Sequence, residues 1–297
     1  MSKSIYEKQN EPLMINCLYA QRRGYTSLKT INLIRYSVSI GITTLFAILL
    51  FIRNNKYIEA IATVLNIVII IADKYLDIFT SKKQKIYAKI QQYFDISCFN
   101  KVLEHNLIEV SSIFVPSEIA ELTSDDYSQK EKNAVCNWYE NYSTLSPIKQ
   151  VYYSQKENVR WNKRNNTRFF IFNILIFVIA IFFLIFFSIK NNITSLKLIG
   201  IISCGLTYFD FSLDIFLKLK KDSHRFSEKE YLIKDIERNL SKMEQNSEYE
   251  LILKFQNLIS EHREECFLIP DLFYHFFRDK DEVKESLIAK QIIGVEE

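Results

Sequence analysis

The longest uncharged run in the sequence, residues 169–189, places the strongest limit on what this chain can fold into. Its 21 residues are almost all Phe, Ile, Leu and Val, and Arg168 and Lys190 bracket it. At 1.5 Å per residue, a helix of this length crosses the ~30 Å hydrocarbon layer of a bilayer. A core helix of a water-soluble protein has a polar face, whereas this run has only Asn173 and Ser188. The run therefore predicts a membrane-spanning helix.

The chain as a whole is much less apolar than this run. Its mean hydropathy is −0.04 and 25% of its residues are charged, so a large part of it is expected to lie in water. Only 5 Gly and 4 Pro are present, which leaves few places for tight turns and favours long helices. The formal net charge of +3 is too small to predict binding to DNA or RNA.

Nothing in the sequence predicts catalysis. The four histidines lack metal-ligand spacing, and P-loop, G-x-S-x-G and G-x-G-x-x-G motifs are missing, so we expect no enzyme activity, cofactor or metal site. The first 30 residues lack the apolar segment of a cleavable signal peptide. The five cysteines form no C-x-x-C pair and are expected to be free thiols facing a reducing cytosol: Cys17, Cys98, Cys136, Cys204 and Cys266.

Three further stretches are candidates for crossing the membrane. Residues 36–52 are uncharged, whereas 57–79 carries four charges, and a fourth stretch runs from about Leu196 to Leu219. An internal repeat supports the weaker two: a shift of 137 residues places Ile52-Arg53-Asn54-Asn55 on Ile189-Lys190-Asn191-Asn192. The same shift places 73–79 on 210–216, which share the pattern Asp-x-x-Leu-Asp-Ile-Phe. We therefore expect two copies of a helical hairpin, with four spanning helices and turns near 53–56 and 190–192.

The soluble segments are expected to share one side of the membrane, because each hairpin returns the chain to the side from which it came. Basic residues crowd the flanks of these segments, for example Arg22, Arg23, Lys82 and Lys83, while the two turns hold only three. By the positive-inside rule that side is the cytoplasm, and both termini lie there.

The predicted fold is an all-α membrane protein with two transmembrane hairpins and helical cytosolic middle and C-terminal segments. Leu13 to Leu28 has the spacing of an amphipathic helix that lies on a membrane surface. The expected divisions are a cytosolic N-terminal amphipathic segment (1–30), hairpin 1 (31–79), a cytosolic helical segment (80–167), hairpin 2 (168–219) and a cytosolic helical tail (220–297).

Polar residues in the second and fourth predicted spans follow one helical face each. A carboxylate at membrane depth costs about 2.5–3.5 kcal/mol, so these faces cannot contact lipid. Either they allow close helix packing with the acids at the cytoplasmic interface, or they line a wet pathway between several subunits. The pore-lining candidates are Glu59, Thr63, Asn66, Asp73 and Asp77, then Gly200, Ser203, Thr207, Asp210 and Asp214.

A basic and polar cluster precedes the third span. One interpretation is a solvated helix whose Lys and Arg meet anionic headgroups. The other is an anion site, in which Arg160 or Arg164 binds a phosphate and Trp161 stacks on a base. The ligand-binding candidates are Gln155, Glu157, Asn158, Arg160, Trp161 and Arg164.

Short strings along nearly the whole chain carry a family resemblance. They are Gln9-Asn10-Glu11, Leu18-Tyr19-Ala20-Gln21-Arg22 with Tyr25 and Lys29, 155–161, 256–263, Pro270-Asp271, Phe273-Tyr274 and Arg278. With these strings the chain resembles the bacterial SMODS-associated four-transmembrane effectors of cyclic-oligonucleotide anti-phage systems. The family tends to have Trp-Asp where this chain has Trp161-Asn162.

The resemblance implies a pore-forming, multi-pass protein of the bacterial inner membrane. A cyclic oligonucleotide made by a partner synthase during phage infection would trigger it, and loss of membrane integrity would stop the infected cell (abortive infection). The implied partners are the lipid bilayer, other copies of the chain and the cyclic oligonucleotide. Two alternatives stay open: a membrane-anchored sensor or scaffold without a pore, and a small-ion transporter.

Overall fold

The computed structural model describes residues 4–52, 56–124, 131, 133–190, 195–246 and 249–296. Within this part the secondary structure is helical, with no strand. In chain order the elements are α1 (Ile5–Lys8), α2 (Pro12–Ile52), α3 (Lys56–Leu103), the short 3₁₀ helix η1 (Val110–Ser112), α4 (Pro116–Thr123), α6 (Pro147–Lys190), α7 (Ser195–Asn246), α8 (Glu250–Glu265) and α9 (Asp271–Glu296).

The position of every proline explains why the helices are so long. Pro12, Pro116 and Pro147 are the first residues of α2, α4 and α6, and Pro270 immediately precedes α9. Proline is favoured at the start of a helix, where its missing N–H would have no partner, and it breaks a helix interior. Because no proline lies inside an element, α2, α3, α6 and α7 run unbroken for 41, 48, 44 and 52 residues.

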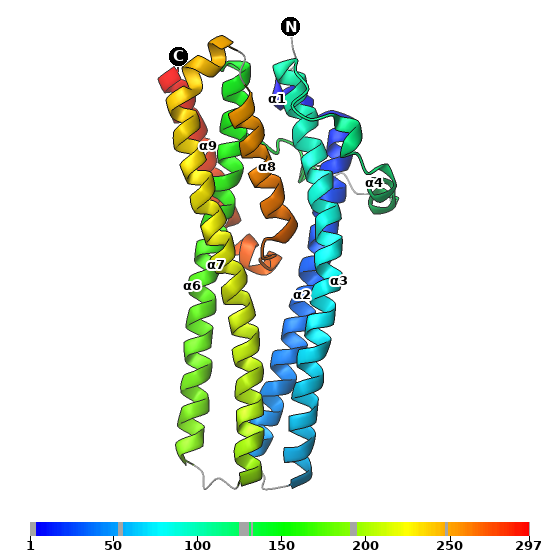
Figure 1. The fold of residues 1–297 in the computed structure, drawn as a ribbon, viewed down its shortest axis with the longest axis vertical. Helices are drawn as coiled ribbons and strands as arrows, with labels where there is room; N and C mark the ends of the chain where they lie inside the picture. The colour runs from blue at the N-terminus through cyan, green and yellow to red at the C-terminus, as the bar shows by residue number, and fades with distance from the viewer. Residues whose placement is uncertain are drawn as a thin grey trace.

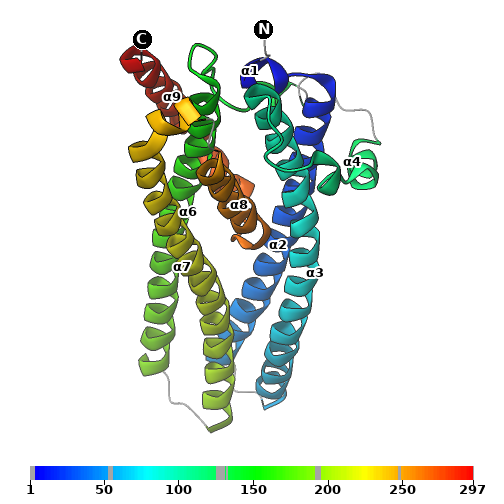
Figure 2. The same ribbon diagram turned by 45° about the horizontal axis from the view of Figure 1, so that its top comes forward.

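The four long helices form two antiparallel hairpins that lie side by side. Figure 1 shows α2 with α3 and α6 with α7, both hairpins closing at the end of the molecule away from the termini. The turns predicted near 53–56 and 190–192 fall mostly outside the described residues, which resume at Lys56, the first residue of α3, and stop at Lys190, the last residue of α6. Figures 1 and 2 show α8 between the two hairpins in the half that carries the termini, where it packs on α3, α6 and α7.

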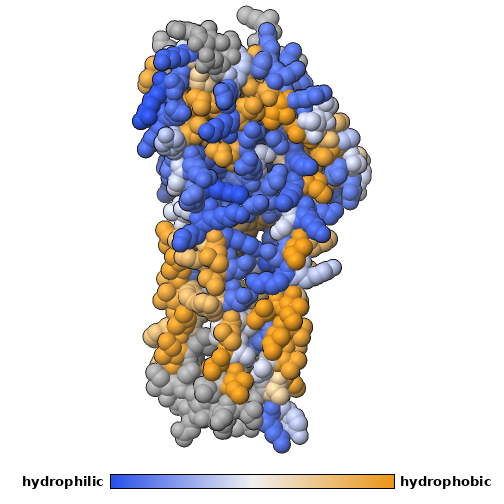
Figure 3. All heavy atoms as spheres, in the orientation of Figure 1, coloured by the Kyte–Doolittle hydropathy of each residue, from blue (hydrophilic) through white to orange (hydrophobic). Residues whose placement is uncertain are grey.

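The two halves of the bundle differ in polarity. The main apolar core lies in the half with the termini, where α1, α2, α3, α6, α7 and α8 enclose large side chains such as Phe94, Phe99, Tyr152 and Phe255. In the other half the apolar side chains point outward, including Ile48 on α2, Ile71 on α3, Phe182 on α6 and Leu206 on α7. Figure 3 shows this as a hydrophobic belt below a hydrophilic half. Such a belt costs too much in water and fits lipid.

Two stretches of the described chain are long and apolar enough to span a membrane, Pro12–Leu49 and Pro147–Phe183. In the second, only 11% of the most apolar window is buried inside the protein. A core helix of a soluble protein would be mostly buried, so this exposure supports contact with lipid.

The predicted amphipathic segment at Leu13–Leu28 does not lie apart on a membrane surface. It is the first part of α2, and its apolar side, including Met14, Leu18 and Leu28, is buried inside the bundle. The apolar face exists as predicted, but a helix partner covers it. The expected boundaries after residues 30, 79, 167 and 219 fall inside α2, α3, α6 and α7, which continue straight through them.

Candidate functional site: polar seam, arginine ladder and open groove

A polar seam runs between the two hairpins inside the belt, and a buried amide lies in it. Thr43 Oγ1 donates to Asn66 Oδ1 at 3.0 Å, which joins α2 to α3. Asn66 Nδ2 donates to Ser203 Oγ at 3.3 Å and lies 3.4 Å from Cys204 Sγ, which joins α3 to α7. Asn66 and Thr43 are fully buried. An amide with its donor and acceptor both used fixes the register of three helices.

Nearer the polar half, the seam is crossed by an ion-pair layer. Arg35 Nε lies 2.7 Å from Asp73 Oδ1, and both side chains are buried. Asp77 Oδ1 is 2.7 Å from Lys218 Nζ and 3.4 Å from Arg35 Nη2. Two further ion pairs complete the layer: Lys218 Nζ lies 3.0 Å from Asp214 Oδ2, and Lys74 Nζ lies 3.1 Å from Asp210 Oδ2. Four acids and three bases thus tie α2, α3 and α7 together, as the hydrophilic patch between the hairpins in Figure 3 illustrates.

The structure brings most of the pore-lining candidates together within one chain. Asn66, Ser203 and the four aspartates line the seam. Thr207 is buried, and its hydroxyl donates a hydrogen bond to the backbone oxygen of Ser203. Thr63 is half-buried. Glu59 and Gly200 fall outside the residues whose side chains the structure describes. Sequence reasoning missed the basic partners Arg35, Lys74 and Lys218.

A second charged cluster, which we term the arginine ladder, lies on α6 in the polar half. Arg160, Arg164 and Arg168 are spaced four residues apart and face α9. Arg160 Nη2 lies 2.7 Å from Glu285 Oε2, and Arg164 Nη1 lies 2.6 Å from Glu285 Oε1. Arg168 Nη1 lies 2.6 Å from Asp281 Oδ2. Both carboxylates are nearly inaccessible to solvent. The helix α9 covers the ladder only in part, because the three arginine side chains stay 17–29% exposed.

The other ligand-binding candidates are also engaged within the protein. The rings of Trp161 and Tyr274 pack together with their centroids 6.0 Å apart, and the Arg164 guanidinium lies over the Trp161 ring. Asn158 Oδ1 accepts from Asn162 at 2.9 Å. Glu157 is buried and accepts from Tyr142 Oη at 3.3 Å. Burial, with the Glu140 and Glu285 carboxylates nearby, raises the pKa of Glu157 to about 8.

Several residues of the family strings meet around one buried carboxylate, Asp95 on α3. It accepts from Tyr139 Oη at 2.6 Å, Gln256 Nε2 at 3.0 Å and Arg263 Nη1 at 2.5 Å. Gln155 donates to Gln256 Oε1 at 3.1 Å, so this ligand-binding candidate belongs to the same network. Gln9 reaches it through both backbone groups of Tyr139, at 2.8 and 3.0 Å. Three distant strings therefore form one structural network, which holds the polar half together.

A buried relay of Asp222, His262 and Lys229 joins α7 to α8. His262 Nε2 donates to Asp222 Oδ1 at 3.0 Å, and Lys229 Nζ donates to His262 Nδ1 at 2.6 Å. Burial lowers the pKa of Lys229 to about 7 and also lowers the pKa of His262. A neutral imidazole between an acid and an amine satisfies this geometry, because one ring nitrogen donates and the other accepts.

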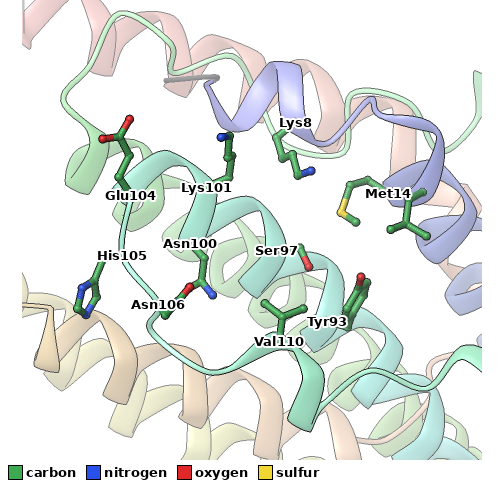
Figure 4. Close-up of a pocket in the computed structure, with 11 residues that line it drawn as sticks. Lys8, Met14, Tyr93, Ser97, Asn100, Lys101, Glu104, His105, Asn106 and Val110 are labelled. Atoms are coloured by element: carbon green, nitrogen blue, oxygen red, sulfur yellow. The ribbon is translucent and has the colours of Figure 1, made fainter. Parts of the chain in front are cut away.

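An open groove of about 500 Å³ lies at the end of the polar half. Figure 4 shows it between α1, the start of α2 and the end of α3, with Lys8, Lys101, His105 and Tyr93 among the residues that line it. This volume is in the range of small-molecule sites. Lys101 makes no ion pair within the described residues. The lining also contains the carboxylate of Glu104, so the charges around the groove are mixed.

Among the described residues there is no group of three or more His, Cys, Asp and Glu side chains placed to hold a metal ion. Comparison with known proteins gives the family directly. The family model described as "SMODS-associating 4TM effector domain" matches residues 3–292. No curated protein and no solved structure matches the chain. Because the match covers nearly the whole sequence, from α1 to α9, the chain belongs to the family of SMODS-associating four-transmembrane effectors.

Proposed function

We propose that this chain is a pore-forming effector of the bacterial inner membrane, opened by a cyclic oligonucleotide during phage infection. The observation that carries the proposal is the polar seam inside an otherwise lipid-facing belt. Hydrophilic side chains at membrane depth are expensive, so their retention along two helices favours a role in conduction. All four long helices cross the bilayer in this proposal, although two of them carry charges.

Opening would require the seam to separate. The ion-pair layer is only partly buried on its α7 side, where Asp210 is 32% and Asp214 24% exposed. Partly exposed pairs contribute little stability, so they can be exchanged for water or for another subunit at small cost. The fully buried Arg35–Asp73 pair stays with hairpin 1, because both residues belong to α2 and α3. The seam would therefore open between α7 and hairpin 1.

For the trigger we propose the arginine ladder. Asp281 and Glu285 present two carboxylates to three guanidiniums, the arrangement that two phosphodiesters would also offer. A cyclic oligonucleotide would compete with the carboxylates for the arginines, while Trp161 at the edge of the ladder would stack on a base. Binding would then loosen α9 from α6.

Dye release from liposomes tests the function. Purified protein in liposomes should release a small dye when a cognate cyclic oligonucleotide is added, and should retain it with the linear nucleotide. Asp210→Asn and Asp214→Asn should change the cation selectivity of the leak without loss of folding. These positions are preferable to Asp73, whose replacement would also leave Arg35 buried without its partner. Intact liposomes at saturating levels of every cyclic di- and trinucleotide would rule out the pore.

Removing the competing carboxylates tests the ligand site. The double variant Asp281→Asn/Glu285→Gln should bind the cyclic oligonucleotide about tenfold more tightly, because the phosphates no longer compete with carboxylates for the arginines. Lys101→Ala in the open groove serves as the matched control and should leave binding unchanged. If Lys101→Ala abolishes binding and the double variant does not strengthen it, the ligand belongs in the groove instead.

A membrane-anchored sensor without a pore is the second candidate. It is favoured by the closed state of the ion-pair layer, in which the four aspartates already have basic partners within one chain. In this case ligand binding at the polar half would recruit a cytosolic partner, and Asp210→Asn would leave growth arrest during infection unchanged. The pore proposal requires that the substitution alter it.

A further inference from the structure

The helix α9 is amphipathic in an unusual sense, because its polar face is buried and its apolar face is exposed. Asp281 and Glu285 point into the bundle and are at most 2% exposed. On the other side, Leu272 and Phe276 are each 82% exposed, Val283 is 63% and Leu287 is 56% exposed. With 3.6 residues per turn, these four apolar residues lie within ~60° of one another around the helix. They form a continuous stripe, which we term the outer stripe.

Lipid can cover only the beginning of the outer stripe. The centroid of the Phe273 ring lies 5.1 Å from that of Phe169 and 5.4 Å from that of Phe172. The helix α9 therefore starts where the apolar run of α6 begins. The contacts of Asp281 with Arg168 and of Glu285 with Arg160 show that α9 then runs along α6 away from this level. At 1.5 Å per residue, Val283 and Leu287 lie about 10 and 16 Å beyond Phe276. A surface-bound helix buries its apolar face only ~5–10 Å deep, so Val283 and Leu287 need a protein partner.

The charges beside the outer stripe identify the partner. Asp279 flanks the stripe on one edge and Lys280 on the other, both are exposed, and neither makes an ion pair within the described residues. Two copies in one membrane have the same orientation, so an axis along the membrane normal would place their α9 helices parallel. In a parallel pair the left edge of one helix faces the right edge of the other. Asp279 of one copy would then meet Lys280 of the next at nearly the same height.

We propose that the outer stripe of α9 is the contact between copies of this chain on the cytoplasmic side of the membrane. This inference rests on the membrane orientation in the proposed function, and it assigns to subunit contact an exposed apolar face that lipid cannot cover. The same helix covers the arginine ladder, so a ligand that loosens α9 would also change how the subunits meet.

Cross-linking in native membranes tests the contact without any ligand or leakage measurement. Leu287→Cys should give a dimer band with a short bis-maleimide. Tyr231→Cys is the matched control, because Tyr231 is 75% exposed on α7 and lies outside the outer stripe. Each is compared with the chain that has no added cysteine. Equal cross-linking of Leu287→Cys and Tyr231→Cys would overturn the proposal.

A charge exchange tests the pairing itself. Asp279→Lys and Lys280→Asp should each reduce the cross-linking of Leu287→Cys about threefold or more, and the double variant should restore it. If the double variant does not restore cross-linking, and all variants are equally folded by circular dichroism, the outer stripe does not bind a second copy of the chain. These readouts need no pore. Cross-linking without dye release would therefore reject the pore and support the interface. Dye release without cross-linking would support the pore and reject the interface.

Discussion

Arg35 on α2 and Asp73 on α3 form a buried ion pair, with Nε and Oδ1 2.7 Å apart and neither side chain more than 2% exposed. This pair lies inside hairpin 1 and sets the rotation of α3, which in turn directs Asp77 toward Lys218 of hairpin 2. The position of the ion-pair layer therefore depends on this contact, while Asn66 fixes the register elsewhere in the seam.

Replacing Arg35 by alanine should strongly destabilise the protein. Asp73 would be left buried without a partner, which typically costs about 3–5 kcal/mol. Unfolding by denaturant in detergent micelles should show this loss. Arg278→Ala is the control, because it breaks an exposed ion pair with Glu282 and should cost about 0.2–1 kcal/mol. Equal effects of the two substitutions would mean that Asp73 finds water or another base.

Gly24 on α2 lies against the ring of Tyr87 on α3 in the polar half. A Cβ at this position would lie 2.7–2.8 Å from three atoms of the Tyr87 ring. Gly24→Ala should therefore destabilise the protein by about 1–3 kcal/mol, because the ring must shift. Gly41, in the same helix, has nothing within 4 Å of an added Cβ, and Gly41→Ala should stabilise by about 0.5–1 kcal/mol. Thermal unfolding of the two variants in parallel checks the contrast, and a loss at Gly41 would show that another subunit approaches that face.

Lys229 should make stability depend on pH. Burial is the main cause of its pKa of about 7, which lies below the ordinary 10.5, and Arg263 and Arg225 lower it further, against Asp222 and Cys266. Between pH ~7 and ~10.5 the unfolded chain holds a proton on this lysine that the folded chain lacks, so the free energy of unfolding rises with pH in this window. Lys229→Met should remove this rise. Melting temperatures at pH 7.5 and 9.5 measure it, and an identical pH response in wild type and variant would contradict the buried neutral amine.

Much of the seam could be predicted from the sequence, because hydrophobic periodicity and an internal repeat can both be recognised without knowing how the helices pack. Asn66 and Ser203, which the 137-residue shift aligns, lie in contact in the structure. Their basic partners could not be predicted in this way. Arg35 directly precedes the uncharged residues 36–52, a position typical of a basic flank residue. Whether it instead enters the seam depends on the rotation of α2 against α3, which no single-helix pattern fixes.

The arginine ladder shows the same limit. The spacing of Arg160, Arg164 and Arg168 marks one face of α6, but it does not say what covers that face. The matching i, i+4 spacing of Asp281 and Glu285 was an available clue, since acids at that interval can span the same three arginines. The outer stripe of α9 follows from the same fact: once the acids face inward, the apolar residues face outward.

Cysteine labelling of intact cells tests most directly the central claim that two hairpins cross the bilayer from the cytoplasmic side. Lys56→Cys, where α3 begins, and Ser195→Cys, where α7 begins, should react with a membrane-impermeant maleimide from outside the inner membrane. Tyr231→Cys should react only after the membrane is permeabilised. Labelling of Tyr231→Cys in intact cells, or protection of either hairpin end until permeabilisation, would contradict the account.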